Sequence, residues 1–203
     1  AREKRVNLFD SLHPYQLVYI HVTFAIISPM KNLPLLLLSL FFIFSCAENN
    51  SYNSRVLNAG TEDESWLLHG RTYDESRFSP LTDINDSNVG ELGLSWSFET
   101  GTNRGHETTP IVVDGMMFIT APWSVVFALE AKTGKEIWSF DPEADKAWAR
   151  NACCDVVNRG VAVWGDHVVF ATIDGRLISL DKESGEVNWD VLTIDKSKPY
   201  TIT

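Results

Sequence analysis

An internal repeat of 51 residues constrains the fold of this chain more than any other feature. Residues 128–138 (ALEAKTGKEIW) align with residues 179–189 (SLDKESGEVNW), and in each copy an apolar run precedes a Thr-Gly or Ser-Gly turn, a second run and a tryptophan. Gly134 and Gly185 are 51 positions apart, as are Trp138 and Trp189. A multi-stranded unit of this length with a fixed tryptophan is typical of a β-propeller blade.

The rest of the chain after residue 65 has the sequence pattern of an all-β protein. Short apolar runs are separated by turn residues about every ten positions, as expected for a sandwich, barrel or propeller. Hairpins are predicted for 111–113 with 116–120 and for 161–163 with 167–172, and Asp174-Gly175 gives a further turn signal. One short helix is predicted at 86–92.

We expect Trp66, Trp96, Trp138 and Trp189 to pack between blades. Two repeat units cannot close a propeller, which typically needs four to eight blades. The sequence therefore predicts a partial propeller from the N-terminal part of a longer protein. His69 and His106 have no metal-ligand companions at useful spacing, so we assign them no metal.

The first 64 residues predict export rather than a folded domain. Residues 1–29 read as a non-native leader, and 30–46 as a signal peptide with Lys31, an apolar run from Leu33 to Phe44 and a lipobox-like end at Cys46. Lipidation of Cys46 is the first expectation and plain secretion the alternative. Residues 47–64 read as a polar tether, and 65–203 as the incomplete propeller domain. The expected location is periplasmic, with an outer-membrane anchor if Cys46 is lipidated.

The chain is acidic, with a formal net charge of -10. It therefore lacks the basic surface that neutralises phosphates in nucleic-acid complexes, and we expect no nucleic-acid partner. An acidic exported domain also has no attraction by charge to an anionic membrane surface.

Cys153 and Cys154 are adjacent, which leaves two interpretations open from the residues alone. Neighbouring Cα atoms lie ~3.8 Å apart, below the roughly 4.4–6.8 Å that is usual for disulfides. A bond between them would close a strained ring, of the kind that clusters at ligand sites. Two free thiols buried as small apolar groups are at least as consistent with the dipeptide, although export favours oxidation.

Four segments together resemble a known family. They are residues 66–79 (WLLHGRTYDESRFS), 88–96 (NVGELGLSW), 102–110 (TNRGHETTP) and 153–159 (CCDVVNR). Their order and spacing are similar to the N-terminal part of pyrroloquinoline quinone (PQQ)-dependent alcohol dehydrogenases, with the quinohaemoprotein branch nearest. The resemblance implies an eight-bladed propeller that holds the quinone in a central funnel.

The resemblance also assigns roles to residues of this chain. Cys153 and Cys154 would form a vicinal disulfide against one face of PQQ, and Arg159 would pair with a cofactor carboxylate. Glu107 would contact the polar edge of the quinone, and Thr203 would hydrogen-bond the cofactor, with Thr201 as a weaker alternative. Asp155 would at most orient a neighbouring backbone amide.

The implied reaction is oxidation of an alcohol to an aldehyde or ketone, with electrons passed to a cytochrome c-type acceptor. In the family the calcium ligands, the catalytic aspartate and the tryptophan beneath the quinone come from later blades, and a haem c domain can follow. We therefore assign no catalytic residue and no metal ligand to residues 1–203, and expect this stretch alone to be inactive.

Two other interpretations keep the propeller and change the function. A lipid-anchored scaffold, like outer-membrane assembly lipoproteins, would suit Cys46 and the repeats. However, a scaffold has no need for Glu107, the cysteine pair and Arg159 at family spacing. The interpretation as a sugar dehydrogenase of the same cofactor class has less support still, because the Cys-Cys motif is of the soluble alcohol-dehydrogenase type.

Overall fold

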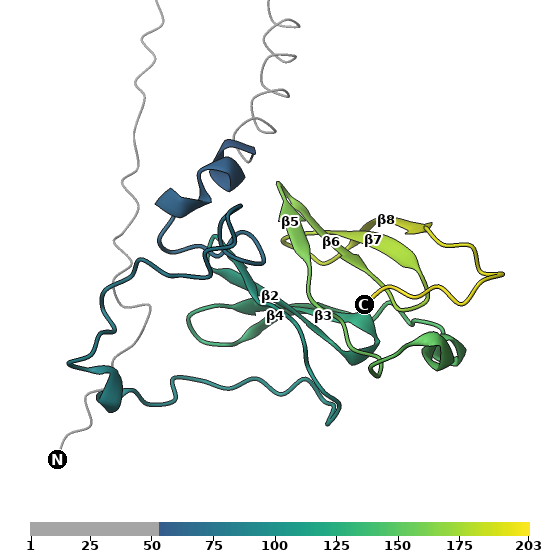
Figure 1. The fold of residues 1–203 in the computed structure, drawn as a ribbon, viewed down its shortest axis with the longest axis horizontal. Helices are drawn as coiled ribbons and strands as arrows, with labels where there is room; N and C mark the ends of the chain where they lie inside the picture. Colours follow the sequence, from purple (N-terminus) through teal and green to yellow (C-terminus); the bar gives the residue numbers. More distant parts are fainter. Residues whose placement is uncertain (1–52) are drawn as a thin grey trace, which may run out of the picture.

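The computed structural model describes residues 53–203 (Figure 1). The predictions of a leader, a signal peptide and lipidation at Cys46 lie outside the described residues. Within 53–203, no helix is long and apolar enough to cross a membrane. Residues 53–57 at the start of this part are α-helical, and the other helices described in it are short 3-10 helices, designated η.

Within residues 53–203, eight strands form two antiparallel sheets of four strands each, which agrees with the multi-stranded unit that the repeat predicts. The first sheet contains β1 (Ile111–Val113), β2 (Met116–Ala121), β3 (Val125–Glu130) and β4 (Glu136–Phe140). The second contains β5 (Ala162–Trp164), β6 (His167–Ala171), β7 (Arg176–Asp181) and β8 (Val187–Leu192). In both sheets the strands are hydrogen-bonded in chain order, so each sheet is a simple meander, here called the first and the second blade.

The two blades match residue for residue. Every strand of the second blade begins 51 positions after its counterpart in the first. Even an irregularity is repeated, because the register shifts between Ala128 and Leu129 in one blade and between Ser179 and Leu180 in the other. The repeat is therefore a repeat of backbone geometry as well as of sequence.

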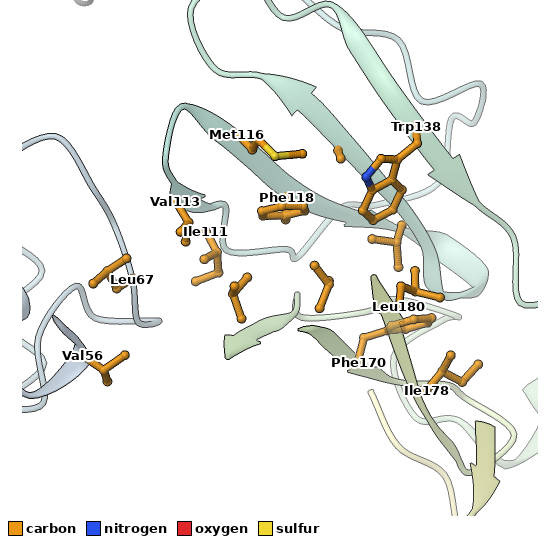
Figure 2. Packing of buried hydrophobic residues seen from close by; sticks show 14 of the residues in the cluster. Val56, Leu67, Ile111, Val113, Met116, Phe118, Trp138, Phe170, Ile178 and Leu180 are labelled. Carbon is orange, nitrogen blue, oxygen red and sulfur yellow. The ribbon is translucent and has the colours of Figure 1, made fainter. Parts of the chain in front are cut away.

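One apolar core fills the space between the two blades (Figure 2). Phe118 and Trp138 from the first blade face Phe170 and the buried aliphatic side chains of the second. The Phe118 and Trp138 ring centroids are 5.9 Å apart, and those of Phe140 and Phe170 are 6.1 Å apart. Aromatic contacts at these separations add to the stabilisation that burial itself provides.

Three of the four tryptophans expected to pack between blades lie against a blade turn or against the core between the blades. Trp138 lies against Gly185 of the next blade, and its indole N–H donates to the Lys182 carbonyl oxygen at 2.9 Å. Trp96 lies in the same way against Gly134. Trp189 is 38% exposed. Trp66 is partly buried against the core between the blades, and its backbone also bridges Val112 as a short extension of the first blade.

The start of the described chain differs from the tether that its polarity suggested. Val56 and Ala59 are each only 3% exposed and belong to the core between the blades. Arg55 forms ion pairs with Glu62 at 2.7 Å and with Asp114 of the β1–β2 turn at 3.0 Å. Folded structure thus begins before residue 65, because two small apolar side chains suffice to anchor a polar segment.

The described chain also contains four 3-10 helices: η1 (Ala59–Thr61), η2 (Val89–Glu91), η3 (Pro122–Ser124) and η4 (Lys146–Asn151). The short helix expected at 86–92 is present as the single turn η2. Between η2 and β1 the chain runs as an arm without strands, seen below the first blade in Figure 1. This arm leads to Glu107, and η4 leads to the cysteine pair.

A buried carboxylate ties the β6–β7 turn to the segment before η4. Asp174 accepts hydrogen bonds from the Thr172 hydroxyl at 2.5 Å and from the Asp145 backbone N–H at 3.2 Å, and it pairs with Arg176. Burial raises the pKa of Asp174, but these hydrogen bonds and the Arg176 charge outweigh it and hold that pKa below its ordinary value. The ionised form is therefore the one that the fold stabilises.

Replacing Asp174 with asparagine is expected to lower the free energy of unfolding by about 1–3 kcal/mol at neutral pH. The pKa of Asp174 is lower in the folded state than its unfolded value of about 4. The ionised carboxylate therefore adds to the free energy of unfolding above about pH 4, and this stabilisation is lost as the pH falls through the folded-state pKa. Urea denaturation from pH 7 down to pH 3 should show the difference from wild type shrinking. Asp86→Asn, at an exposed position, is the control; a difference that grew towards low pH would contradict this account.

Candidate functional site

The expected cofactor-binding residues, all within the described residues, lie in segments that enter or leave blades and not within a strand. Glu107 is on the approach to β1, and the stretch from Cys153 to Arg159 connects η4 to β5. Thr203 follows β8 by eleven residues. Three separate parts of the chain must therefore meet for these residues to form one site.

Arg159 is the point where they meet. Its guanidinium Nη2 lies 3.1 Å from Glu107 Oε2, and its Nη1 donates to the Thr203 hydroxyl. Thr203, rather than the alternative Thr201, thus contacts the arginine. The Arg159 and Glu107 side chains are 50% and 44% exposed, so solvent reaches both. An exposed ion pair contributes only about 0–1 kcal/mol to stability, and such a pair can exchange its partner for a ligand at little cost.

Cys153 and Cys154 lie beside this cluster with both side chains exposed. Their Sγ atoms are 2.6 Å apart and are unbonded in this structure. The buried-thiol interpretation is therefore wrong, since neither cysteine serves as a core residue, while the disulfide stays a prediction. The pKa of the Cys154 thiol is raised, first by its hydrogen bond with Cys153 and further by the Glu107 carboxylate, which Arg159 partly offsets. A thiol of raised pKa is a poor nucleophile near neutral pH.

A second ion pair links the same two segments. Arg104, three residues before Glu107, bonds the Asp155 carboxylate that follows the cysteine pair. The Arg104 guanidinium also lies 5.7 Å from the centre of the Trp123 ring, and Lys146 lies 5.8 Å from it. Asp155 is thus a salt-bridge partner of the arm. Arg104, Lys146 and Trp123 were not singled out by the sequence, because their pairing depends on the fold.

Backbone contacts hold the cysteine segment against the first blade. The Trp123 N–H donates to the Val156 carbonyl oxygen at 2.9 Å, and the Thr109 N–H donates to the Arg159 carbonyl oxygen at 3.2 Å. Trp123 and Ser124 both have φ near +65°, at 68° and 65°. Left-handed backbone at two successive non-glycine residues is costly, and such strain concentrates at functional sites.

A cavity of about 700 Å³ lies elsewhere, between the N-terminal segment and the β1–β2 turn. Its wall includes Arg55, Glu62, Asp114, Met116 and Ile137. Burial raises the pKa of Asp114, but hydrogen bonds and charge from Arg55 and Lys182 bring it below its ordinary value. None of the expected cofactor residues lines this cavity, so it is separate from the cluster around Arg159.

Comparison with known proteins identifies a family over most of the chain. Residues 66–190 match the family model described as "PQQ: Glucose/ethanol/alcohol dehydrogenase, beta-propeller domain". Quinohemoprotein alcohol dehydrogenase ADH-IIG of Pseudomonas putida is 50% identical over 155 residues, which are 76% of this chain and 22% of that protein. The 1-butanol dehydrogenase (cytochrome c) of Thauera butanivorans is 51% identical over 139 residues, 68% of this chain and 20% of that protein.

Solved structures agree with the sequence comparison. The structure of ADHIIG from Pseudomonas putida HK5 superposes with a TM-score of 0.72 at 50% identity, covering 74% of this chain and 22% of the other. The quinohemoprotein alcohol dehydrogenase of Comamonas testosteroni gives 0.69 at 41% identity, covering 76% and 23%. The chain thus spans about a fifth of the length of the curated relatives it matches. It belongs to the PQQ-dependent glucose/ethanol/alcohol dehydrogenase β-propeller family.

Proposed function

We propose that this chain forms part of a periplasmic quinoprotein that binds PQQ at the Arg159 cluster and oxidises alcohols, passing the electrons to a cytochrome c. The observation that carries the proposal is the convergence of Arg159, Glu107 and Thr203 beside Cys154 from three separate segments. A half-exposed guanidinium with a neighbouring carboxylate and hydroxyl provides donors and acceptors on one small surface.

The chemistry of these side chains fits PQQ, which is a flat quinone with three carboxylates. Arg159 would hold one carboxylate bidentately, because a guanidinium is always charged and presents a planar fork of N–H donors. Thr203 would donate or accept one hydrogen bond, and Glu107 would accept from an N–H of the cofactor. Cys153 and Cys154 would provide a polarizable surface beside the ring. When bound, PQQ supplies the redox chemistry and the protein supplies its position.

The substrate and acceptor are inferred from the relatives. The names of the matched proteins specify alcohol dehydrogenases, and one specifies cytochrome c as the acceptor. Calcium is the metal that the resemblance implies beside the quinone, and a haem c domain is the further cofactor of the quinohaemoprotein branch. Among residues 53–203, no group of three or more His, Cys, Asp or Glu is placed to hold a metal ion, so this proposal assigns no calcium ligand here. Export through residues 30–46, with or without lipidation of Cys46, belongs to the same proposal.

The proposal is tested on the full-length protein, mixed with PQQ and calcium and then separated from free cofactor. We expect retained quinone absorbance and reduction of an electron-accepting dye that depends on ethanol or another alcohol. Glucose in place of alcohol serves as the control for the sugar-dehydrogenase alternative. Absence of both bound quinone and activity with a range of alcohols would overturn the proposal in favour of a scaffold.

The vicinal disulfide is a separate prediction. If Cys153 and Cys154 are oxidised in the exported protein, alkylation without reduction should leave both unmodified. Reduction followed by alkylation should then add two alkyl groups to the peptide that contains them. Intact-mass and peptide mass spectrometry measure both states. Two alkylated cysteines without prior reduction would show that the pair is reduced.

A further inference from the structure

A buried polar network links the two segments that carry Glu107 and Arg159. Thr120 of β2 contributes two groups to it: its backbone N–H donates to the Thr108 hydroxyl at 2.9 Å, and its own hydroxyl donates to the Asn158 carbonyl oxygen at 3.3 Å. Thr108 follows Glu107 directly, and Asn158 directly precedes Arg159. A single residue of the first blade therefore holds the neighbours of both site residues.

The Asn158 side chain extends this network into the second blade. Its amide nitrogen donates to Ser124 Oγ at 3.2 Å and to the Ala171 carbonyl oxygen at 2.8 Å, while its amide oxygen accepts from the Gly160 N–H at 3.0 Å. Ser124 belongs to η3 in the first blade, and Ala171 ends β6 in the second. Asn158 itself is only 4% exposed. It thus joins the first blade, the second blade and its own segment at one buried point.

The exposed contacts of the site do not by themselves fix the positions of Arg159 and Glu107. The pair between Arg159 and Glu107 is half exposed, and ion pairs of that kind restrain side chains weakly. The buried Asn158 amide is different, because both of its polar atoms are hydrogen-bonded and removal of a partner leaves a desolvated polar group. Among residues 53–203, no buried side-chain nitrogen or oxygen atom lacks a hydrogen-bond partner.

We propose that Asn158 is a positioning residue of the cofactor site, which fixes Arg159 and the cysteine pair between the two blades. The inference rests on the proposed function for the identity of the ligand, PQQ. An amide fits this place because it combines two N–H donors with a carbonyl acceptor on one short side chain. Aspartate has the same shape but offers no donor to Ser124 or Ala171.

The test compares Asn158→Asp with wild type in the full-length protein by two readouts. The first is the dissociation constant for PQQ, measured by absorbance titration at fixed calcium, which we expect to rise by about tenfold or more. The second is amide hydrogen exchange in the absence of PQQ. We expect faster exchange in peptides covering 105–110 and 153–160, with β6 and β7 unchanged. Asn158→Ala repeats the comparison if the aspartate variant does not fold.

Two further comparisons separate positioning from loss of stability. Val168→Ala removes buried apolar volume from the core between the two blades, so it should lower the melting temperature and raise exchange across both blades without changing the PQQ dissociation constant. Thr120→Val removes the hydroxyl donor to Asn158, and Thr120→Ser retains it. The valine variant should weaken PQQ binding, and the serine variant should restore it.

The outcomes distinguish this inference from the proposed function. If wild type does not bind PQQ, the proposed function fails, and local exchange still tests whether Asn158 fixes the segment. If wild type binds PQQ and Asn158→Asp binds it equally well, the positioning role is overturned while the proposed function stands. Exchange that rises across both blades, as for Val168→Ala, would overturn it too, because the asparagine would then be a general stabilising residue.

Discussion

Arg159→Ala is expected to raise the dissociation constant for PQQ by roughly tenfold to a hundredfold. The substitution removes a cation that contacts both Glu107 and Thr203. It also leaves the Glu107 carboxylate facing the carboxylates of the incoming cofactor without compensation. Arg159→Lys should lie between alanine and wild type, because it retains the charge and loses the planar fork. Titration of the protein with PQQ at fixed calcium measures all three.

Arg150→Ala is the matched control for this experiment. Arg150 lies in the last turn of η4, is exposed, and is nine residues before Arg159. It should leave PQQ affinity unchanged and should not alter the melting temperature beyond a degree or so. Equal affinity of Arg159→Ala and wild type would refute the assignment of a cofactor carboxylate to this arginine.

Gly185→Ala is expected to destabilise the protein by about 2–5 kcal/mol. Gly185 has a φ of +74°, which an alanine adopts only at a cost, and a Cβ atom there would lie 2.7 Å from the Trp138 ring. Trp138 is also held by its bond to the Lys182 carbonyl oxygen, so the ring cannot simply move aside. The contact joins the blades, and urea denaturation should show the loss as a lower midpoint.

Gly165→Ala separates backbone strain from the clash. Gly165 has a φ of +58°, and a Cβ atom there meets nothing within 4 Å. This variant should therefore lose only the strain contribution of about 1–2 kcal/mol. If both variants lost the same free energy of unfolding, the close packing of Trp138 on Gly185 would add nothing to the stability of the contact between the blades.

The fold was predictable because its signal is repeated. Period-two apolar runs, Asp-Gly turns and the spacing from Gly134 to Gly185 identify the strands, and the second copy confirms the first. The N-terminal boundary was less predictable. Val56 and Ala59 are buried in a segment whose other residues are polar, and no periodicity distinguishes two small anchoring residues from a tether.

Part of the site was predictable from the sequence, but the buried hydrogen bonds that position it were not. The sequence identified Arg159 and Glu107 by resemblance, and the structure brings them within 3.1 Å of each other. Asn158 stands beside Arg159 in the same motif, yet nothing in the sequence says that its side chain is buried between Ser124 and Ala171. Partners that are 34 and 13 positions away are set by how two blades pack, which local sequence patterns do not encode.

The position of the site outside the strands has an evolutionary consequence. Glu107 and Asn158 occupy equivalent places in the two copies, each just before the first strand of its blade, yet one is a site carboxylate and the other a buried amide. Duplication could therefore copy the strands, the glycine turn and the tryptophan unchanged while the entering segments diverged. Selection on ligand chemistry and selection on folding would then act on separate stretches of the same gene.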